Sequence, residues 1–225
     1  MRKILKLGFV GGGVGSTIGL THYISSQLDG KWKVVAGFFS RNKKDNLKTA
    51  FTWNIDKSRV YQNLNDFIKS EKNYLDVVVV LTPTPNHFEI LKKLLNEKIS
   101  IICEKPLGLN LREAKLMAKT VKKKKLFACV NHQLRFYPNI VKMKQLLDKK
   151  YLGKINYISI NHHTDMIDEK NDDNWWLNEK LAGGQLYALG SHLVDLIQFL
   201  NGKIRSLTSC QGSFTKMKKF KKMIW

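Results

Sequence analysis

The chain has 225 residues, of which 43% are hydrophobic, so it can bury one sizeable core or two small ones and is too apolar for a chain that stays disordered. Its formal net charge of +21 means that nucleic acids and anionic membranes have to be considered as partners. However, 33 of the 39 basic residues are lysines, and most of them fall at outward positions of expected helices, which is typical of a solvated surface. We therefore expect no nucleic-acid partner and no membrane partner.

The sequence offers no pattern for membrane insertion, export or metal binding. No segment reaches the roughly 18 consecutive apolar residues that a membrane-spanning helix needs, and the first residues lack a secretory leader pattern. The three cysteines are too scattered for a disulfide framework or a zinc site. His162 and His163 are neighbours on an expected strand and would point to opposite faces. The sequence predicts a cytoplasmic protein with reduced thiols and no metal.

Short β-rich runs alternate with helical patterns through the first half of the chain, which indicates a parallel sheet covered by helices. The expected strands cover residues 6–10, 33–39, 77–81, 99–103 and 126–131. The four consecutive valines at 77–80 predict a strand buried on both faces. Asn86, and Asn110 with Glu113 three residues later, are expected to cap helices, with the acidic residue reaching back.

A glycine-rich turn, Gly11-Gly12-Gly13-Val14-Gly15-Ser16, follows the first expected strand and opens a helix. Such a turn lets the backbone approach a pyrophosphate, and the N-terminus of the helix supplies unpaired N–H donors. Ser16 stands at the third glycine of the G-x-G-x-x-G pattern, so the strand–turn–helix setting carries more weight than the motif. We predict a Rossmann domain over residues 1–130. The turn residues expected to bind the dinucleotide are Gly11, Gly13, Val14, Gly15 and Ser16.

The end of the second expected strand bears on the choice between NAD and NADP. NAD-binding domains place an acidic residue there for the ribose 2′-hydroxyl, whereas this chain has Ser40 and Arg41, with Lys43 and Lys44 close by. An arginine makes paired, charge-assisted hydrogen bonds to a phosphate, and the serine hydroxyl adds another. These residues favour NADP, and NAD stays open as the alternative.

Two polar motifs follow the third and fourth expected strands. Thr82-Pro83-Thr84-Pro85-Asn86-His87 comes after one strand and Glu104-Lys105-Pro106 after the other. The carboxyl ends of parallel strands meet at one edge of the sheet, and open α/β sheets bind their ligands at that edge. We therefore expect both motifs to lie at the dinucleotide site.

The pattern changes near residue 131, where we predict a second domain over residues 131–225. Its expected elements are a helix beginning at Pro138, a strand over 155–163, a long loop over 164–180, a helix over 186–200 and a strand over 204–213. The loop contains Trp175 and Trp176, and a loop of that length in a compact domain is usually functional or disordered.

The motifs occur in the order in which a known family has them. After the glycine turn come Thr-Pro-x-x-x-His at 82–87, Glu-Lys-Pro at 104–106 and Arg135-Phe136-x-Pro138. Trp175-Trp176 then precedes a glycine-rich segment at 182–195 that carries His192 and Asp195. From Leu5 to about Ser213 the chain resembles the glucose-fructose oxidoreductase and inositol dehydrogenase family, often called Gfo/Idh/MocA.

The resemblance implies roles for individual residues. In such enzymes the lysine of Glu-Lys-Pro lies beside the nicotinamide, and here that lysine is Lys105. An ammonium there stabilises the alkoxide character that grows on the substrate oxygen, and the family's histidine, here His192, takes the hydroxyl proton. Further contacts with the cofactor are implied for Ser40, Arg41, Thr82, Pro83, His87, Glu104 and Lys105. Contacts with the substrate are implied for Lys105, Arg135, Trp175, Trp176 and His192.

The resemblance also implies a substrate class and an architecture. The substrate is expected to be a sugar, a polyol or a related cyclic alcohol, with NADP or NAD as the cofactor. The fold class is α/β: a Rossmann domain followed by an α+β domain with an open, largely antiparallel sheet. Family members use that sheet for dimerisation, which makes a homo-oligomer the expected assembly. Because only two of its strands are evident, we expect the second domain to be truncated at its C-terminal end.

Ala188 departs from the family pattern. Many members carry an aspartate four residues before the histidine, on the same face of the helix, and an alanine can neither orient the imidazole nor move a proton. The sequence leaves three hypotheses about function. The chain is an NAD(P)-dependent dehydrogenase acting on CH–OH groups, a non-catalytic dinucleotide-binding protein of a regulatory or vestigial kind, or a nucleic-acid binder driven by its charge.

Overall fold

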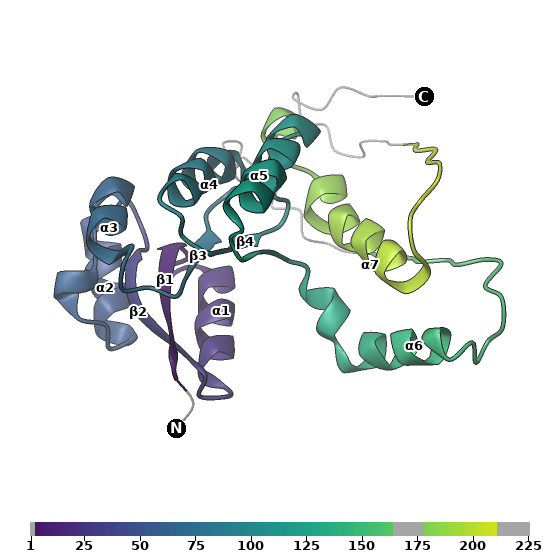
Figure 1. The fold of residues 1–225 in the computed structure, drawn as a ribbon, viewed down its shortest axis with the longest axis horizontal. Helices are drawn as coiled ribbons and strands as arrows, with labels where there is room; N and C mark the ends of the chain where they lie inside the picture. The colour runs from purple at the N-terminus through teal and green to yellow at the C-terminus, as the bar shows by residue number, and fades with distance from the viewer. Residues whose placement is uncertain (1–2, 164–177, 211–225) are drawn as a thin grey trace. The chain divides into compact units, whose positions relative to one another are not determined.

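Five parallel strands form the sheet that the alternating pattern predicts (Figure 1). The computed structural model describes residues 3–163 and 178–210, and the chain divides into two compact units, residues 1–131 and 132–225. The strands of the first unit are β1 (Leu5–Gly11), β2 (Trp32–Phe38), β3 (Val77–Leu81), β4 (Ile101–Glu104) and β5 (Ala128–Asn131). All five predicted strands are confirmed, with ends that differ by at most two residues.

Helices separate the strands of the first unit. They are α1 (Thr17–Gln27), α2 (Lys43–Thr52), α3 (Leu64–Glu71), α4 (His87–Asn96) and α5 (Leu111–Lys124), with 3₁₀ turns at Lys57–Arg59 and Thr84–Asn86. The cap at Asn110 is confirmed: its side chain accepts the Glu113 N–H at 3.0 Å, and the Glu113 carboxylate accepts the Leu109 N–H at 2.8 Å. Asn86 occupies the predicted N-cap position of α4, but its side chain makes no capping bond, because its backbone is already helical in the preceding 3₁₀ turn.

The strand order is β2-β1-β3-β4-β5, and every pair is parallel. From β1 the chain moves outward to β2 and then returns to place β3 on the other side of β1. A single parallel bridge between Gly37 and Val60 continues the sheet beyond β2. The order therefore reverses between β1 and β3. Open α/β sheets bind ligands outside the carboxyl ends of the strands at such a reversal.

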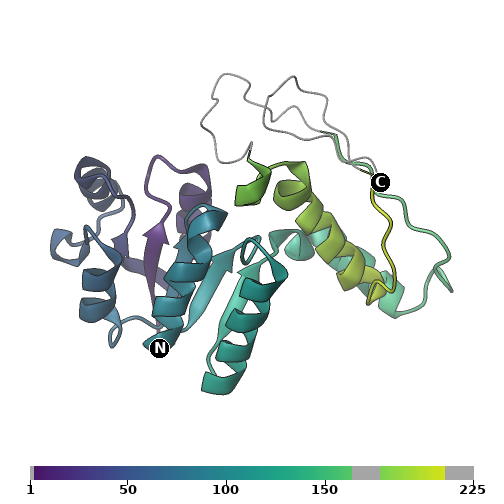
Figure 2. The same ribbon diagram turned by 90° about the horizontal axis from the view of Figure 1, so that it is seen from above.

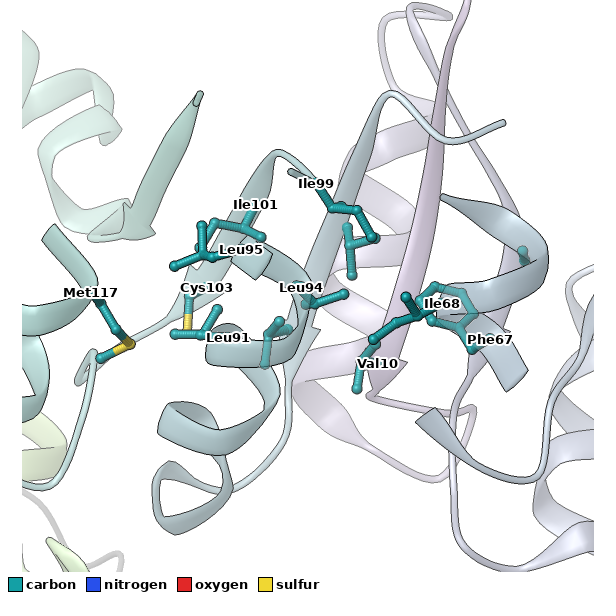
Figure 3. Close-up of a cluster of buried hydrophobic side chains, with 13 residues drawn as sticks. Val10, Phe67, Ile68, Leu91, Leu94, Leu95, Ile99, Ile101, Cys103 and Met117 are labelled. Atoms are coloured by element: carbon teal, nitrogen blue, oxygen red, sulfur yellow. The ribbon is translucent and has the colours of Figure 1, made fainter. Parts of the chain in front are cut away.

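Each face of the sheet has its own hydrophobic core, and Figure 2 shows helices on both sides of the strands. On one face α3, α4 and α5 contribute Phe67, Leu91 and Met117, which pack with Val10 and Ile101 (Figure 3). On the other face Phe9, Phe39 and Trp53 make edge-to-face contacts. All five residues of β3 are buried, as the valine run predicts. Burying each large apolar side chain stabilises the fold by roughly 1.5–3 kcal/mol. The two cores therefore hold the strands in place, and with them the strand ends that carry the polar motifs.

Helices make up the regular structure in the described part of the second unit. The helix α6 (Pro138–Asp148) begins at the predicted proline, which the first turn of a helix tolerates. A 3₁₀ turn at Gln133–Phe136 precedes it, and another occupies Glu179–Leu181. The predicted helix over 186–200 is present in two parts, a π-helical turn at Leu186–Gly190 and then α7 (Ser191–Asn201).

The strands predicted in the second unit are wrong wherever the structure describes them. Residues 155–163 and 204–210 form no strand, and nearly all of these residues are exposed. An extended segment becomes a strand only when a neighbour completes its ladder of hydrogen bonds, and residues 132–163 and 178–210 contain no strand that could pair with either. The described sheet is wholly parallel, so the expected antiparallel sheet is not found in this part of the chain. Assembly through it stays a prediction.

No helix within the described ranges is long and apolar enough to cross a membrane. The cytoplasmic location stays a prediction.

Candidate functional site

The glycine-rich turn lies at the carboxyl end of β1, against the end of β3. A Cβ atom at Gly11 would lie 2.8 Å from Thr82 Cγ2, and one at Gly13 would lie 2.8 Å from Thr49 Oγ1. Gly11 also has a φ of +80°, which side chains rarely adopt. At Gly15, in contrast, no described heavy atom lies within 4 Å of the Cβ position. The turn is therefore closely packed on its inner side and open at Gly15.

Hydrogen bonds within the protein hold the turn in shape. The Val14 N–H donates to Thr49 Oγ1 at 3.0 Å, and the Ser16 N–H donates to the Gly13 carbonyl at 2.8 Å. The Ser16 hydroxyl caps α1 by accepting the Gly19 N–H at 3.2 Å. Val14 and Ser16, both predicted cofactor residues, thus use these N–H groups to fix the turn.

Gly19 takes the packing role that the third glycine of the motif usually has. A Cβ atom at Gly19 would lie 1.9 Å from the Gly12 carbonyl oxygen, so α1 reaches the turn only because residue 19 has no side chain. A pattern counted from Gly11 puts Ser16 in this role and overlooks Gly19. The available signal was a glycine in the first turn of the helix.

The end of β3 carries a polar group suited to a ligand. The Thr82 hydroxyl oxygen is buried, and it has no hydrogen-bond partner among the described residues. A buried hydroxyl without a partner costs free energy. Because Thr82 lies beside Gly11 at the reversal of strand order, a polar ligand atom there would supply the partner. The open side of the turn and this hydroxyl together fit a dinucleotide.

The segment after β2 binds the 2′ position of the ribose in dinucleotide-binding domains. The Ser40 N–H donates to Asn46 Oδ1 at 2.8 Å, and the Ser40 hydroxyl lies 3.4 Å from Asp45 Oδ2. The Arg41 side chain is exposed. The structure therefore places an acidic residue, Asp45, beside the predicted phosphate ligands. Sequence reasoning overlooked it because it lies in the first turn of α2 and not at the strand end.

His87 joins the two polar motifs inside the protein. It is 1% exposed at the start of α4, with Nδ1 2.9 Å from the Pro106 carbonyl oxygen and Nε2 2.8 Å from that of Thr82. Burial lowers the pKa of His87, and the two carbonyl contacts act in the opposite direction. Its side chain thus ties the segment after β3 to the segment after β4.

Glu104, the last residue of β4, is 6% exposed and hydrogen-bonded through both carboxylate oxygens. Oε1 lies 2.7 Å from His22 Nε2 and 2.6 Å from Asn131 Nδ2, and Oε2 accepts the Lys105 N–H at 3.3 Å. Burial acts to raise the pKa of Glu104, but the hydrogen bonds from His22 and Asn131, together with the charges of His22 and Lys105, hold the pKa below its usual value. Glu104 is therefore an anion at neutral pH.

Lys105 follows directly, and its peptide bond to Pro106 is cis. Burial lowers the pKa of the Lys105 ammonium, while the charge of Glu104 acts in the opposite direction. A lysine with a lowered pKa exchanges its proton more readily near neutral pH, and as an ammonium it stabilises a developing alkoxide.

Sequence reasoning overlooked His22 and Asn131. His22 lies on α1, Asn131 ends β5, and their nitrogen atoms are 3.3 Å apart. Neither residue belongs to a motif, and His22 precedes Glu104 by 82 positions. A polar residue at the end of the fifth expected strand was the available signal for Asn131. Nothing in the sequence pattern singled out His22.

In the second unit, polar side chains gather around Asp195 of α7. Arg135 Nε donates to Asp195 Oδ2 at 2.7 Å, and the Arg135 Nη2 atom pairs with the other carboxylate oxygen. The guanidinium carbon lies 5.2 Å from the centroid of the Phe199 ring. Arg135, predicted to contact substrate, thus already has a bidentate carboxylate partner within its own unit.

His192 is buried on α7, 6% exposed, and its ring meets that of His132 edge to face at 5.7 Å between centroids. Ala188 is also 6% exposed and lies in the π-helical turn before α7. The position at which many family members carry an aspartate is thus occupied by a buried methyl group. Such π-helical turns are frequent at functional sites.

Trp175 and Trp176, predicted to contact substrate, lie outside the described residues. Within residues 3–163 and 178–210, no three or more His, Cys, Asp and Glu side chains are grouped so as to hold a metal ion. The strand on which the argument about His162 and His163 depended is not formed.

A family model decides the relationship of this chain to known proteins. Residues 5–132, more than half of the chain, match the model described as "Oxidoreductase family, NAD-binding Rossmann fold". The chain belongs to the Gfo/Idh/MocA oxidoreductase family. Residues 140–220 match the model of the Gfo/Idh/MocA C-terminal domain. The family resemblance and the Rossmann domain predicted from the sequence are therefore confirmed.

Curated relatives of this Gfo/Idh/MocA chain match it in part. An uncharacterized oxidoreductase of Schizosaccharomyces pombe is 29% identical over 151 residues, which are 67% of this chain and 40% of the relative. The glucose-fructose oxidoreductase domain-containing protein 1 of Xenopus tropicalis is 30% identical over 129 residues, 57% of this chain and 33% of the relative. The chain thus covers less than half of the length of either relative.

Two solved structures are similar to this chain in fold. An inositol dehydrogenase homolog from Azotobacter vinelandii, complexed with NAD+, has a TM-score of 0.79 and 23% identity, with 89% of this chain and 54% of that chain covered. The WlbA dehydrogenase of Bordetella pertussis, in complex with NADH and UDP-GlcNAcA, has a TM-score of 0.79 and 20% identity, with 90% and 56% covered.

Proposed function

We propose that this Gfo/Idh/MocA chain is an NAD(P)-dependent oxidoreductase that transfers hydride between a nicotinamide cofactor and a CH–OH group of a sugar, polyol or related cyclic alcohol. The observation that carries the proposal is Lys105, which has a lowered pKa and lies at the same sheet edge as the glycine turn and Thr82. β1, β3 and β4 are consecutive neighbours in the sheet, so their carboxyl ends adjoin. A similar structure contains both NADH and myo-inositol, which supports the substrate class.

The proposed roles combine the local chemistry of the described residues with what the family resemblance implies. When bound, the nicotinamide accepts or donates the hydride. Gly15 would leave room for the pyrophosphate, and the Thr82 hydroxyl would bond to a polar atom of the dinucleotide. Lys105, as an ammonium, would stabilise negative charge on the substrate oxygen, and His192 would take the hydroxyl proton. The other residues in the proposed cofactor site are Gly11, Gly13, Val14, Ser16, Ser40, Arg41, Pro83, His87 and Glu104. The other residues proposed to contact substrate are Arg135, Trp175 and Trp176.

Turnover with a panel of polyols and sugars, followed by the absorbance of reduced cofactor, tests the proposal. Because Lys105 is assigned to the reacting oxygen, Lys105→Ala is expected to lower kcat by about 100-fold or more. Lys105→Arg should be nearly as harmful, since a planar guanidinium on a longer side chain cannot take the place of a compact ammonium at the substrate oxygen. Cofactor affinity, measured by calorimetry, should change little in either variant. Equal turnover of wild type and Lys105→Ala would overturn the assignment.

The second candidate function is non-catalytic dinucleotide binding, and the buried methyl group of Ala188 favours it. Ala188→Asp is the discriminating variant, because it supplies the carboxylate that many family members place before the histidine. If the chain is an enzyme, this variant should raise turnover. A wild type that binds cofactor but turns over no polyol or sugar, together with an inactive Ala188→Asp, would favour the non-catalytic protein. Thermal unfolding checks that the new carboxylate leaves the variant folded, because burying a charge is costly.

A further inference from the structure

A buried carboxylate at the sheet edge is held by two side chains from distant parts of the chain. Glu104 Oε1 lies 2.7 Å from His22 Nε2 and 2.6 Å from Asn131 Nδ2. The side chains of His22 and Glu104 are 16% and 8% exposed. The contact therefore fastens α1, which follows the glycine turn, to the ends of β4 and β5.

The second oxygen of the same carboxylate bears on Lys105. Glu104 Oε2 accepts the backbone N–H of Lys105 at 3.3 Å, so the side chain of one residue folds back onto the amide of the next. With Oε1 held by two donors, the carboxylate has a fixed plane, and the bond from Oε2 then restrains the backbone from which the Lys105 side chain extends. Hydrogen bonds to a charged acceptor are roughly twice as strong as neutral ones, which suits such a restraint.

We propose that His22, Glu104 and Asn131 form a positioning triad that sets the place of Lys105 for hydride transfer. The proposal rests on the function proposed above. In it, His22 and Asn131 are positioning residues that act through Glu104, and neither touches the reacting atoms.

Other titratable groups face Glu104 and have different uses. The Cys103 thiol has its pKa raised by burial, and further by the charge of Glu104, so it stays neutral. Both ring nitrogens of His87 contact backbone carbonyls, and the charge of Glu104 acts to raise the pKa of His87. The Lys105 ammonium is the remaining charge that lowers the pKa of Glu104 besides His22. The hydrogen bonds to the Glu104 carboxylate described within residues 3–163 come from His22, Asn131 and the Lys105 backbone.

The ionisation of Glu104 gives the first test, and it needs no substrate. The chain has seven glutamates, so their carboxyl carbons can be labelled with carbon-13 and titrated by NMR, with Glu104→Gln assigning the signal. His22→Leu and Asn131→Leu each remove a donor from the buried carboxylate and should raise the pKa of Glu104 above its wild-type value. His22→Gln keeps an N–H donor near the position of Nε2 but removes the charge of His22, so the pKa of Glu104 should lie between those of wild type and His22→Leu.

The kinetic test asks whether the restraint reaches Lys105. Because small displacements of a reacting group are costly, kcat should fall about 10- to 100-fold in His22→Leu and in Asn131→Leu. The KM for cofactor should stay within about twofold, and His22→Gln should recover most of the loss. Ser25→Ala, an exposed change on the same helix, is the matched control and should leave both readouts unchanged.

The outcomes separate this proposal from the function on which it rests. If no substrate is found, the titration of Glu104 still decides whether the triad holds the carboxylate. Folded leucine variants with an unchanged pKa of Glu104 would overturn the triad. An equal loss of kcat in His22→Gln and His22→Leu would overturn the role of its hydrogen bond. Should the leucine variants fail to fold, His22→Ala and Asn131→Ala provide the same readings.

Discussion

At the scale of single residues, the choice of cofactor depends on charges at the end of β2. Arg41 is exposed there with Lys43 and Lys44, but Asp45 lies 3.4 Å from the Ser40 hydroxyl. Three cations outnumber one carboxylate, so we predict that NADP binds at least as tightly as NAD. Arg41→Ala should lower the affinity for NADP about tenfold, or 1.4 kcal/mol, and leave that for NAD within about twofold.

Calorimetry with both cofactors measures these affinities, and Asp45→Asn is the matched change of opposite sign. It should tighten NADP binding, since it removes a negative charge near the expected 2′-phosphate. A wild type that binds NAD tenfold better than NADP would contradict the interpretation of this segment. That result would instead indicate that Asp45 binds the ribose 2′-hydroxyl of NAD.

The same scale shows which site residues a sequence can reveal. The place of Glu104 and Lys105 at the sheet edge was predictable because they form a short contiguous motif at the end of a predicted strand. His22 was not, because its contact with Glu104 spans 82 positions and forms only in the folded protein, where α1 brings His22 to the end of β4. Asp45 and Gly19 were missed for a different reason. Asp45 lies a few residues after the strand end at which an acidic residue is usual, and Gly19 lies three residues after the third glycine position of the motif.

At the scale of elements, the approach of α1 to β1 depends on one residue. A Cβ atom at Gly19 would lie 1.9 Å from the backbone oxygen of Gly12, and a backbone atom cannot rotate away as a side chain can. Gly19→Ala is therefore predicted to lower the free energy of unfolding by about 2–3 kcal/mol, because the helix must shift. Gly15→Ala, with nothing within 4 Å of its Cβ position, should change it by less than about 1 kcal/mol.

Chemical denaturation followed by circular dichroism compares the two variants, and calorimetry adds a second reading. Gly15→Ala should weaken dinucleotide binding although the protein stays as stable as wild type, because its methyl group would occupy the open side of the turn. A stable Gly19→Ala would show that the helix can move without cost. Unchanged nucleotide affinity in Gly15→Ala would place the pyrophosphate elsewhere.

Prediction of strands and helices succeeded where the local sequence pattern was sufficient to define the element. The run at 77–81 is apolar on both faces and became the central strand β3, with every residue buried. The strand predicted over 155–163 also alternates, but alternation describes only the side chains, and a strand further requires a neighbour with free hydrogen-bonding groups. The π-helical turn before α7 was equally hidden, since its sequence has the same periodicity as an ordinary helix.

At the scale of the whole molecule, the large positive net charge should affect stability. Lysines such as Lys115, Lys119 and Lys123 are exposed along α5, and the formal net charge is +21. Like charges repel over about 30 Å at 0.01 M salt but only about 10 Å at 0.1 M. We therefore predict that the melting temperature rises as salt is added over this range. Lys119→Glu places a negative charge four residues from both Lys115 and Lys123 on the helix. This variant should raise the melting temperature at low salt and much less at high salt.

The same charge makes the nucleic-acid hypothesis testable by titration with salt. A surface of scattered lysines binds duplex DNA only through its phosphates, so binding should be weak, with a Kd of about 10⁻⁴–10⁻⁶ M at physiological salt, and independent of sequence. Fluorescence anisotropy with two unrelated duplexes across a salt series measures both properties. Lys119→Glu should lower the affinity for both duplexes equally, because it removes a phosphate contact and no base contact. A Kd near 10⁻⁸ M for one duplex, at least a thousandfold tighter than for the other, would instead be the behaviour of a specific DNA-binding protein.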